Sequence, residues 1–114
     1  MSNLVAVYGT LKYNKSNHSV MHRADGLLVG QTTTPPSFRM FSMGGFPFLV
    51  EDDTGYPIHI EVYEVANMAP LDRLEGYPSF YNRKKVSTEY GDAWIYYIQN
   101  IDTNKYLEVP SGIW

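Results

Sequence analysis

The sequence predicts an α+β fold, in which about five to seven short strands form a closed or nearly closed β-barrel with two short helices. The chain has 114 residues, and its 44% hydrophobic and 18% charged content suits a single domain, residues 1–114, with one compact core. Short apolar or alternating runs recur along it, each bounded by Gly, Pro, Asn or Asp. Only two segments carry the start and stop signals of a helix.

The first run, Leu4 to Tyr8, is apolar and partly β-branched, which is typical of a strand buried on both faces. A polar loop follows it. Ser16 or Asn17 can then cap a short helix that reaches about Ala24.

The next part of the chain predicts three strands separated by turn residues. Pro35-Pro36 and Gly44-Gly45 divide them, and a turn at residues 51–55 ends the last one. The three strands are expected at Gly26–Thr34, Phe38–Met43 and Phe46–Val50.

A strictly alternating run, Ile58–Val65, gives the clearest strand pattern. One face of the strand carries Ile58, Ile60, Val62 and Glu64. The other face carries His59, Glu61, Tyr63 and Val65.

The second helix has the stronger start and stop signals. Asn67 can cap it and Pro70 suits its first turn, while Gly76 is a natural C-terminal stop. Leu71 and Leu74 are expected on one side.

Two closing strands are predicted at Phe80–Tyr90 and Ala93–Gln99, joined by a turn at Gly91-Asp92. The apolar residues of the tail are expected to pack back on the body as a turn or short strand: Tyr106, Leu107, Val109 and Trp114.

Composition and charge exclude several classes of protein. The absence of Cys excludes a disulfide scaffold, a thiolate metal site and a cysteine nucleophile. The net charge of −3 argues against a nucleic-acid partner, and the one basic cluster, residues 83–85, fits a solvated strand edge. No signal-peptide pattern and no apolar run of roughly 20 residues occurs, so we expect a soluble, cytoplasmic protein without a membrane partner.

Metal and cofactor motifs are equally sparse. His18 and His22 are four residues apart and would share a helix face, but no Glu or Cys in that stretch supplies a third ligand. Neither a phosphate-binding loop, a dinucleotide fingerprint nor a nucleophile elbow is present. The expectation is no metal and no cofactor.

The first candidate site is the segment Tyr8-Gly9-Thr10-Leu11, where the first strand ends. A turn at the mouth of a buried strand can present successive backbone N–H groups to a carboxylate or an oxyanion. Gly9 permits both a close approach and unusual backbone angles. The alternative is an ordinary turn at the end of a strand.

The second candidate is Glu75, the last residue before the expected helix stop. Helix-end carbonyl dipoles disfavour a negative charge there, and shielding by neighbouring aromatics would raise the pKa of the carboxyl group further. Such a group suits proton transfer near neutral pH. The alternative is a surface Glu paired with Arg73 or Arg39, whereas Asp72 is expected to be solvated or to cap the helix.

The third candidate is Tyr81, which follows Glu75 closely and can form one wall of a small pocket and donate its hydroxyl. Core packing is the alternative for this side chain.

Together these segments resemble the gamma-glutamylcyclotransferase superfamily, most closely its short gamma-glutamylamine cyclotransferase type. Residues 7–12 resemble the family's N-terminal glycine motif, and Asn17 stands where short members commonly have an Asn. Residues 71–77 with 80–83 resemble the Glu-containing helix end and its Tyr-x-Arg, and residues 93–97 resemble a late strand. One departure is Ile60 before Glu61, where members usually carry a small residue.

The resemblance implies a small mixed β-barrel with short peripheral helices and a pocket at one mouth. It implies that Tyr8, Gly9, Thr10 and Leu11 bind a glutamyl group, largely through backbone N–H groups, and that Glu75 transfers the protons. The substrate would be a small γ-glutamyl amine or γ-glutamyl peptide whose own α-amine attacks its γ-carbonyl. The products would be 5-oxoproline and a free amine or amino acid.

Two other functions fit the same scaffold. One is a non-catalytic relative that binds a small glutamyl-like ligand or a protein partner. The other is an amide hydrolase, which would release glutamate in place of 5-oxoproline. Glu75 beside an intact Tyr8–Leu11 segment favours the cyclotransferase, because a protein that only binds needs no carboxylate there.

Overall fold

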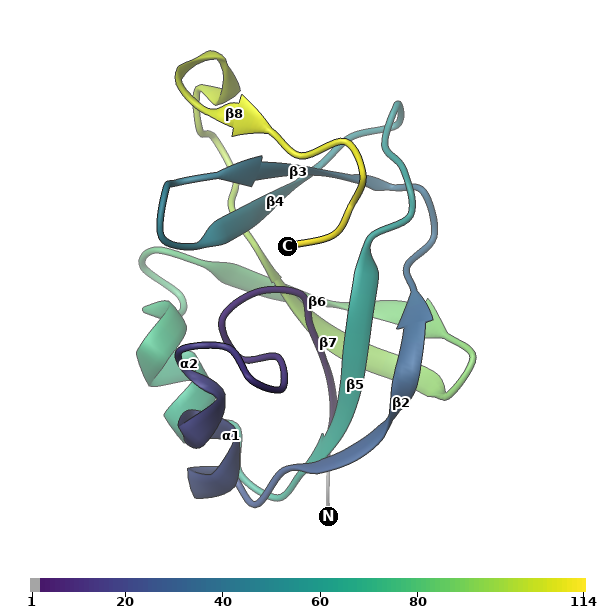
Figure 1. The fold of residues 1–114 in the computed structure, drawn as a ribbon, viewed down its shortest axis with the longest axis vertical. Helices are drawn as coiled ribbons and strands as arrows, with labels where there is room; N and C mark the ends of the chain where they lie inside the picture. The colour runs from purple at the N-terminus through teal and green to yellow at the C-terminus, as the bar shows by residue number, and fades with distance from the viewer. Residues whose placement is uncertain (1–2) are drawn as a thin grey trace.

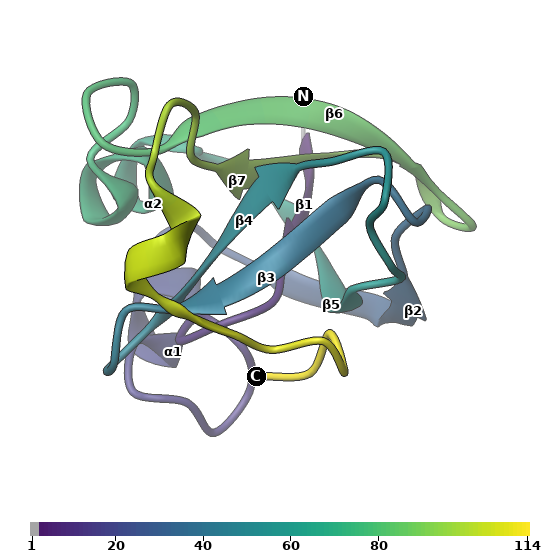
Figure 2. The ribbon, with the colours of Figure 1, turned by 90° about the horizontal axis from the view of Figure 1, so that it is seen from above.

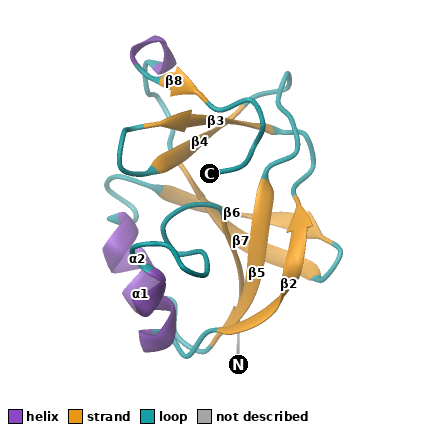
Figure 3. Ribbon diagram, viewed as in Figure 1, coloured by secondary structure: helices purple, strands orange, loops and turns teal. Residues whose placement is uncertain are grey.

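The structure, a computed structural model, describes residues 3–114. These residues contain eight strands and two short α-helices (Figures 1 and 3). Met1 and Ser2, with which the predicted domain begins, lie outside the described residues. The elements in chain order are β1 (Asn3–Val7), α1 (His18–Arg23), β2 (Leu27–Thr33), β3 (Phe38–Ser42), β4 (Pro47–Glu51), β5 (His59–Val65), α2 (Ala69–Glu75), β6 (Asn82–Thr88), β7 (Gly91–Tyr97), a 3-10 turn (Thr103–Lys105) and β8 (Leu107–Glu108).

The strands form two sheets, one with the order β2-β5-β1-β7-β6 and one with the order β4-β3-β8. In the larger sheet β1 runs antiparallel to β5 and parallel to β7, so the predicted α+β class and the mixed sheet are both confirmed. The small sheet crosses over one end of the larger one (Figure 2).

The two sheets do not close into a barrel, and the described strands number eight where five to seven were expected. Pro35 and Pro36 lie between β2 and β3 and have no N–H to donate to a ladder, so the chain leaves the first sheet there. Between β4 and β7, the Ile98 N–H donates to the Leu49 carbonyl over 2.9 Å, which joins the sheets at one point.

The central strand β1 is buried on both faces, as its apolar run predicts. Val5 and Val7 pack in a cluster with α1 and α2, whereas Ala6 and Tyr8 pack in a second cluster with residues of the small sheet. The alternation predicted for β5 divides in the same way: Ile58, Ile60 and Val62 face the second cluster, and Tyr63 and Val65 face the first.

Helix α2 begins and ends near the predicted residues. The N-cap residue is Met68 and not the expected Asn67, whose side chain accepts from the Ala69 N–H over 3.0 Å. Gly76 ends the helix in the left-handed conformation with φ 66°, as predicted. Leu71 is fully buried, but Leu74 remains 39% exposed, so only one of the two expected apolar contacts forms. Within residues 3–114, no helix has the length and apolar character needed to cross a membrane.

The closing hairpin turns two residues earlier than predicted. Strand β6 ends at Thr88 and β7 begins at Gly91, so the turn lies at residues 89–90 and not at Gly91-Asp92. The Thr88 hydroxyl donates to the Gly91 carbonyl and accepts from the Tyr90 N–H, which fixes the tighter turn. The tail packs back as a short strand, as predicted: β8 pairs with β3, and the Gly112 carbonyl accepts from the His59 N–H over 2.8 Å. Leu107 is the exception among the apolar residues expected to pack, since it remains 81% exposed.

Candidate active site

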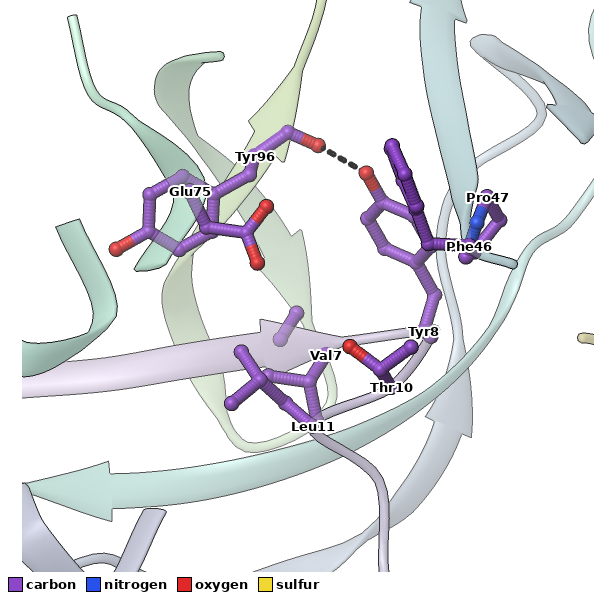
Figure 4. Close-up of a pocket in the computed structure, with 10 residues that line it drawn as sticks. Val7, Tyr8, Thr10, Leu11, Phe46, Pro47, Glu75 and Tyr96 are labelled. Carbon is purple, nitrogen blue, oxygen red and sulfur yellow. Dashed lines mark hydrogen bonds between the residues drawn. The ribbon is translucent and has the colours of Figure 1, made fainter. Parts of the chain in front are cut away.

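A cavity lies where the parallel strands β1 and β7 end side by side, next to the C-terminal end of α2 (Figure 4). The cavity is small, and the space free of protein atoms within it measures about 350 Å³ when the part open to solvent is included. Its lining residues come from four separate parts of the chain: Ala6, Val7, Tyr8, Gly9, Thr10, Leu11, Phe46, Pro47, Glu75 and Tyr96. The structure therefore brings Tyr8–Leu11 and Glu75, two of the three predicted candidates, to one cavity.

The backbone of residues 9–11 offers hydrogen-bond donors at this cavity. Within residues 3–114, the N–H groups of Gly9, Thr10 and Leu11 donate to no protein group. The carbonyls of Gly9 and Thr10, by contrast, accept from Lys12 and Asn17 at 3.1 and 2.9 Å. Unpaired donors at the mouth of a buried strand are the arrangement that binds a carboxylate or an oxyanion.

Polar side chains fix the loop that follows β1. The Asn17 side-chain amide donates to the Thr10 hydroxyl over 2.9 Å, and the Tyr13 N–H donates to a Glu61 carboxylate oxygen over 2.8 Å. Asn17 is the N-cap residue of α1, one of the two expected, but its side chain makes no cap hydrogen bond. It is directed back to Thr10 instead.

Gly9 is required by a close approach. A Cβ atom on Gly9 would lie 2.7 Å from Cγ of Pro47, far inside normal contact distance, whereas its φ lies outside the left-handed range. Of the two reasons predicted for this glycine, the structure supports the close approach and not the unusual backbone angle.

The ring of Tyr8 lines the cavity, and its hydroxyl donates to the Tyr96 carbonyl over 2.7 Å (Figure 4). Burial is the main cause that raises the pKa of the Tyr8 hydroxyl, with the neighbouring Tyr81 and Glu75 adding to it. The hydroxyl is therefore neutral over the physiological range and serves as a fixed donor.

Glu75 is the last residue of α2, and its carboxyl group points into the cavity (Figure 4). Burial raises the pKa of this carboxyl to about 7. The expected alternative, a surface ion pair, does not form: within residues 3–114 no Lys, Arg or His pairs with Glu75, and Arg39 pairs with Asp52 and Glu108.

Tyr81, the third candidate, is buried and is not one of the lining residues. Its hydroxyl donates to the Pro47 carbonyl over 2.8 Å, so it supports a lining residue from behind. Burial first, and the charge of Glu75 second, raise the pKa of this hydroxyl.

Phe46, Pro47 and Tyr96 also line the cavity, and the sequence pattern does not indicate this. Nothing in the local pattern of a strand marks which of several aromatics faces a cavity, and Tyr96 meets Tyr8 only through the pairing of β1 with β7. Asp72, expected to be solvated or to cap the helix, instead accepts from the Tyr96 hydroxyl over 2.7 Å.

The cavity contains one ionisable carboxyl, Glu75, and no Lys, Arg or His lines it. Among residues 3–114, no three His, Cys, Asp or Glu side chains gather as metal ligands would. His18 and His22 lie edge to face with ring centroids 5.3 Å apart, and His18 Nδ1 lies 2.9 Å from the Leu11 carbonyl. A carboxyl with a pKa near 7 opposite free backbone donors can move protons on a substrate that those donors hold.

A family model described as gamma-glutamyl cyclotransferase, AIG2-like, matches residues 5–114. A Vibrio cholerae protein provisionally named a gamma-glutamylcyclotransferase is 39% identical, covering 100% of this chain and 96% of that protein. The gamma-glutamylcyclotransferase family protein YtfP of Escherichia coli is 33% identical, covering 96% of this chain and 94% of YtfP.

Solved structures of the same fold include two relatives. The solution structure of Escherichia coli YtfP superimposes with a TM-score of 0.75 at 30% identity, covering 97% of this chain and 95% of that one. The crystal structure of an AIG2-like protein from mouse gives a TM-score of 0.77 at 25% identity, covering 90% of this chain and 81% of that one.

Proposed function

Because the chain belongs to the gamma-glutamyl cyclotransferase, AIG2-like family, we propose that it closes the ring of a γ-glutamyl amine or γ-glutamyl peptide. The α-amine nitrogen of the glutamyl group forms a bond to the γ-carbonyl carbon, and the bond from that carbon to the departing nitrogen breaks. Counted from the α-ammonium, that nitrogen loses two protons and the departing nitrogen gains two, so the free amine leaves as an ammonium. The products are 5-oxoproline and a free amine or amino acid, with no water consumed.

Glu75 carries the protons in this proposal. At neutral pH the α-amine is an ammonium and cannot attack until it loses a proton, which the Glu75 carboxylate accepts. The same group then donates a proton to the departing nitrogen. A pKa of about 7 suits both steps, because the charged form that accepts a proton and the neutral form that donates one are both well populated at neutral pH.

The loop of residues 9–11 binds and orients the glutamyl group. Its unpaired N–H groups suit the α-carboxylate or the oxygen of the tetrahedral intermediate, and the lining contains no cationic side chain that would take that place. A pocket that holds the flexible glutamyl chain folded brings the amine close to the carbonyl before reaction. Because the nucleophile belongs to the substrate, the protein needs none of its own.

The observation that carries the proposal is the juxtaposition of a half-buried carboxyl group, with its pKa raised to about 7, and the unpaired N–H groups of residues 9–11 at one cavity. A protein that only binds a glutamyl-like ligand gains nothing from such a carboxyl, whose burial destabilises the fold.

The test is incubation of the purified protein with a panel of γ-glutamyl amines and γ-glutamyl dipeptides, followed by separate quantification of 5-oxoproline and glutamate. We expect 5-oxoproline in amounts equal to the released amine. Glutamate in its place would indicate an amide hydrolase. Binding of the substrates without either product would indicate a non-catalytic relative, and both outcomes would overturn the proposal.

A further inference from the structure

We propose that Asp72 and Tyr96 form a positioning pair, fixed by Arg83, that holds Glu75 opposite the loop of residues 9–11. This inference rests on the role proposed for Glu75. The proposal does not require Asp72, Tyr96 or Arg83 to bind the substrate through a charged group. Their part is to set where the Glu75 carboxyl stands relative to the backbone donors.

Tyr96 connects the two sides of the cavity. Its carbonyl accepts from the Tyr8 hydroxyl and its own hydroxyl donates to Oδ1 of Asp72, both over 2.7 Å. Tyr96 is only 3% exposed; its bond with Tyr8 is buried, and its bond with Asp72 is partly buried. The chain of contacts therefore runs from the residue that begins the loop to the helix that carries Glu75.

Asp72 lies one helical turn before Glu75 in α2, which has only seven residues. In so short a helix, one fixed side chain settles both the rotation of the helix and its position along the axis. The bond from Tyr96 to Asp72 thus determines how far the Glu75 carboxyl reaches into the cavity.

Arg83 holds Asp72 from the other side. Its Nε lies 3.4 Å from Oδ1 of Asp72, and its guanidinium carbon lies 4.7 and 4.4 Å from the ring centroids of Tyr77 and Trp94. Contact with two aromatic rings restricts the rotamers of the long Arg side chain. Oδ1 of Asp72 therefore accepts a hydrogen bond from a neutral donor and lies beside a cation, whose buried Nε makes no hydrogen bond within residues 3–114.

The decisive variants are Tyr96→Phe, which removes the hydroxyl and keeps the ring at the cavity, Asp72→Ala, and the double variant. We expect kcat to fall about 10- to 100-fold in each single variant while KM changes little, because a small misplacement of the proton-transfer group is enough for such a loss. The double variant should be no worse than the poorer single one, since both single variants remove the same hydrogen bond between Tyr96 and Asp72.

A second measurement does not depend on turnover. The pKa of Glu75, followed by ¹³C NMR of labelled glutamate carboxyls, should be about 7 in the parent protein and fall by one unit or more in both single variants. The cause would be entry of water once α2 is free to shift. Val86→Ala in β6 is the control, because Val86 is buried in the second cluster and takes no part in the hydrogen bonds or the ion pair that run from Tyr8 to Arg83.

The outcomes separate the two proposals. Folded Tyr96→Phe and Asp72→Ala proteins with parental kcat and an unchanged Glu75 pKa would overturn the positioning pair while leaving the cyclotransferase intact. A parent protein that forms no 5-oxoproline, but whose Glu75 pKa falls in the variants, would overturn the proposed reaction and leave the positioning of Glu75 supported. Equal losses in Val86→Ala would show that the pair acts through stability alone.

Discussion

Among the single residues, Glu75 lies where burial disfavours a negative charge, and the same burial suits its carboxyl group to the proton transfer proposed above. Burial raises the pKa of its carboxyl from 4.5 to about 7, so the folded protein disfavours the charged form by about 3 kcal/mol. The folded state keeps the proton longer than the unfolded chain does. The free energy of unfolding therefore falls as the pH rises from about 4.5 to about 7, and this contribution is absent below that range.

Glu75→Gln removes this titration, so the variant should be more stable than the parent above pH 7 by up to about 3 kcal/mol and equally stable near pH 4. Urea unfolding at pH 4 and pH 8 measures the difference, in which the other titrating groups cancel. A variant with the same stability advantage at both pH values would show that the carboxyl is not the cause.

The same substitution should lower kcat by about 10² to 10⁴-fold, the usual loss when a general acid–base is removed. In the parent, kcat/KM should rise with pH through about 7 and then level off, because the carboxylate form is the one that accepts the proton. Near-parental turnover in Glu75→Gln would mean that another group transfers the proton.

Gly9 gives a second residue-level prediction. In Gly9→Ala or Gly9→Val the new side chain overlaps the Pro47 ring, so the loop or the ring must move; we expect KM to rise about tenfold or more, with some loss of stability. Gly45→Ala is the matched control, since nothing lies within 4 Å of a Cβ there. A folded Gly9→Ala protein with parental KM would mean that the glutamyl group binds elsewhere.

Which residues could be found from the sequence follows from the range of their interactions. Gly9 and Glu75 were found because a strand end and a helix stop are marked by neighbours in the chain. Asp72 and Tyr96 are 24 residues apart, and their hydrogen bond depends on how α2 docks on β7, which no local pattern shows. A contact between Tyr81 and the substrate stays a prediction. In the structure the Tyr81 hydroxyl donates to the Pro47 carbonyl.

At the level of the elements, the loop between β1 and α1 is tied to the helix start through Asn17 and Thr10. Thr10→Val keeps the shape of the side chain and removes the acceptor, so KM should rise about fivefold, the equivalent of one hydrogen bond of about 1 kcal/mol. Thr10→Ser retains the hydroxyl and should change KM little. Equal KM values in Thr10→Val and Thr10→Ser would show that the hydrogen bond between Asn17 and Thr10 does not contribute to substrate binding by the loop.

The strands and helices themselves were largely predictable, because apolar runs, alternation and turn residues are properties of short segments. The predicted starts and ends of β2, β3 and β5 differ from the structure by one residue at most. The hairpin between β6 and β7 was misplaced because Gly91, an apparent turn residue, begins the strand with φ 118°. Asn17 was correctly placed at the N-cap position of α1, but the sequence does not show that its side chain bonds to Thr10 and not to the helix.

For the molecule as a whole, the tail that follows β8 closes one end of β5. Gly112→Ala should lower Tm by about 5 °C or more relative to Gly44→Ala. Gly112 has φ 69° and Gly44 has φ 97°, so an added Cβ strains the backbone in both variants. Only at Gly112 would that Cβ lie 2.3 Å from the Pro57 carbonyl oxygen, whereas Gly44 faces open space. Equal Tm values would mean that the tail is not firmly docked.

The arrangement of two sheets was beyond sequence analysis for a physical reason. Whether eight short strands close into one barrel or divide into two sheets depends on which edges pair, and each edge pairing joins residues far apart in the chain. The alternating pattern of a strand specifies its two faces but not its neighbours.

The place of β1 in its sheet has a consequence for the order of folding. This strand comes first during synthesis, yet its two neighbours, β5 and β7, are made from residues 59–65 and 91–97. Such non-local pairing closes long loops and slows folding relative to local contacts. A nascent chain that ends before β7 leaves one edge of β1 without its partner and Tyr8 without the carbonyl of Tyr96. The cavity can therefore form only after β7 has left the ribosome, so nascent chains that lack β7 should have no competent site.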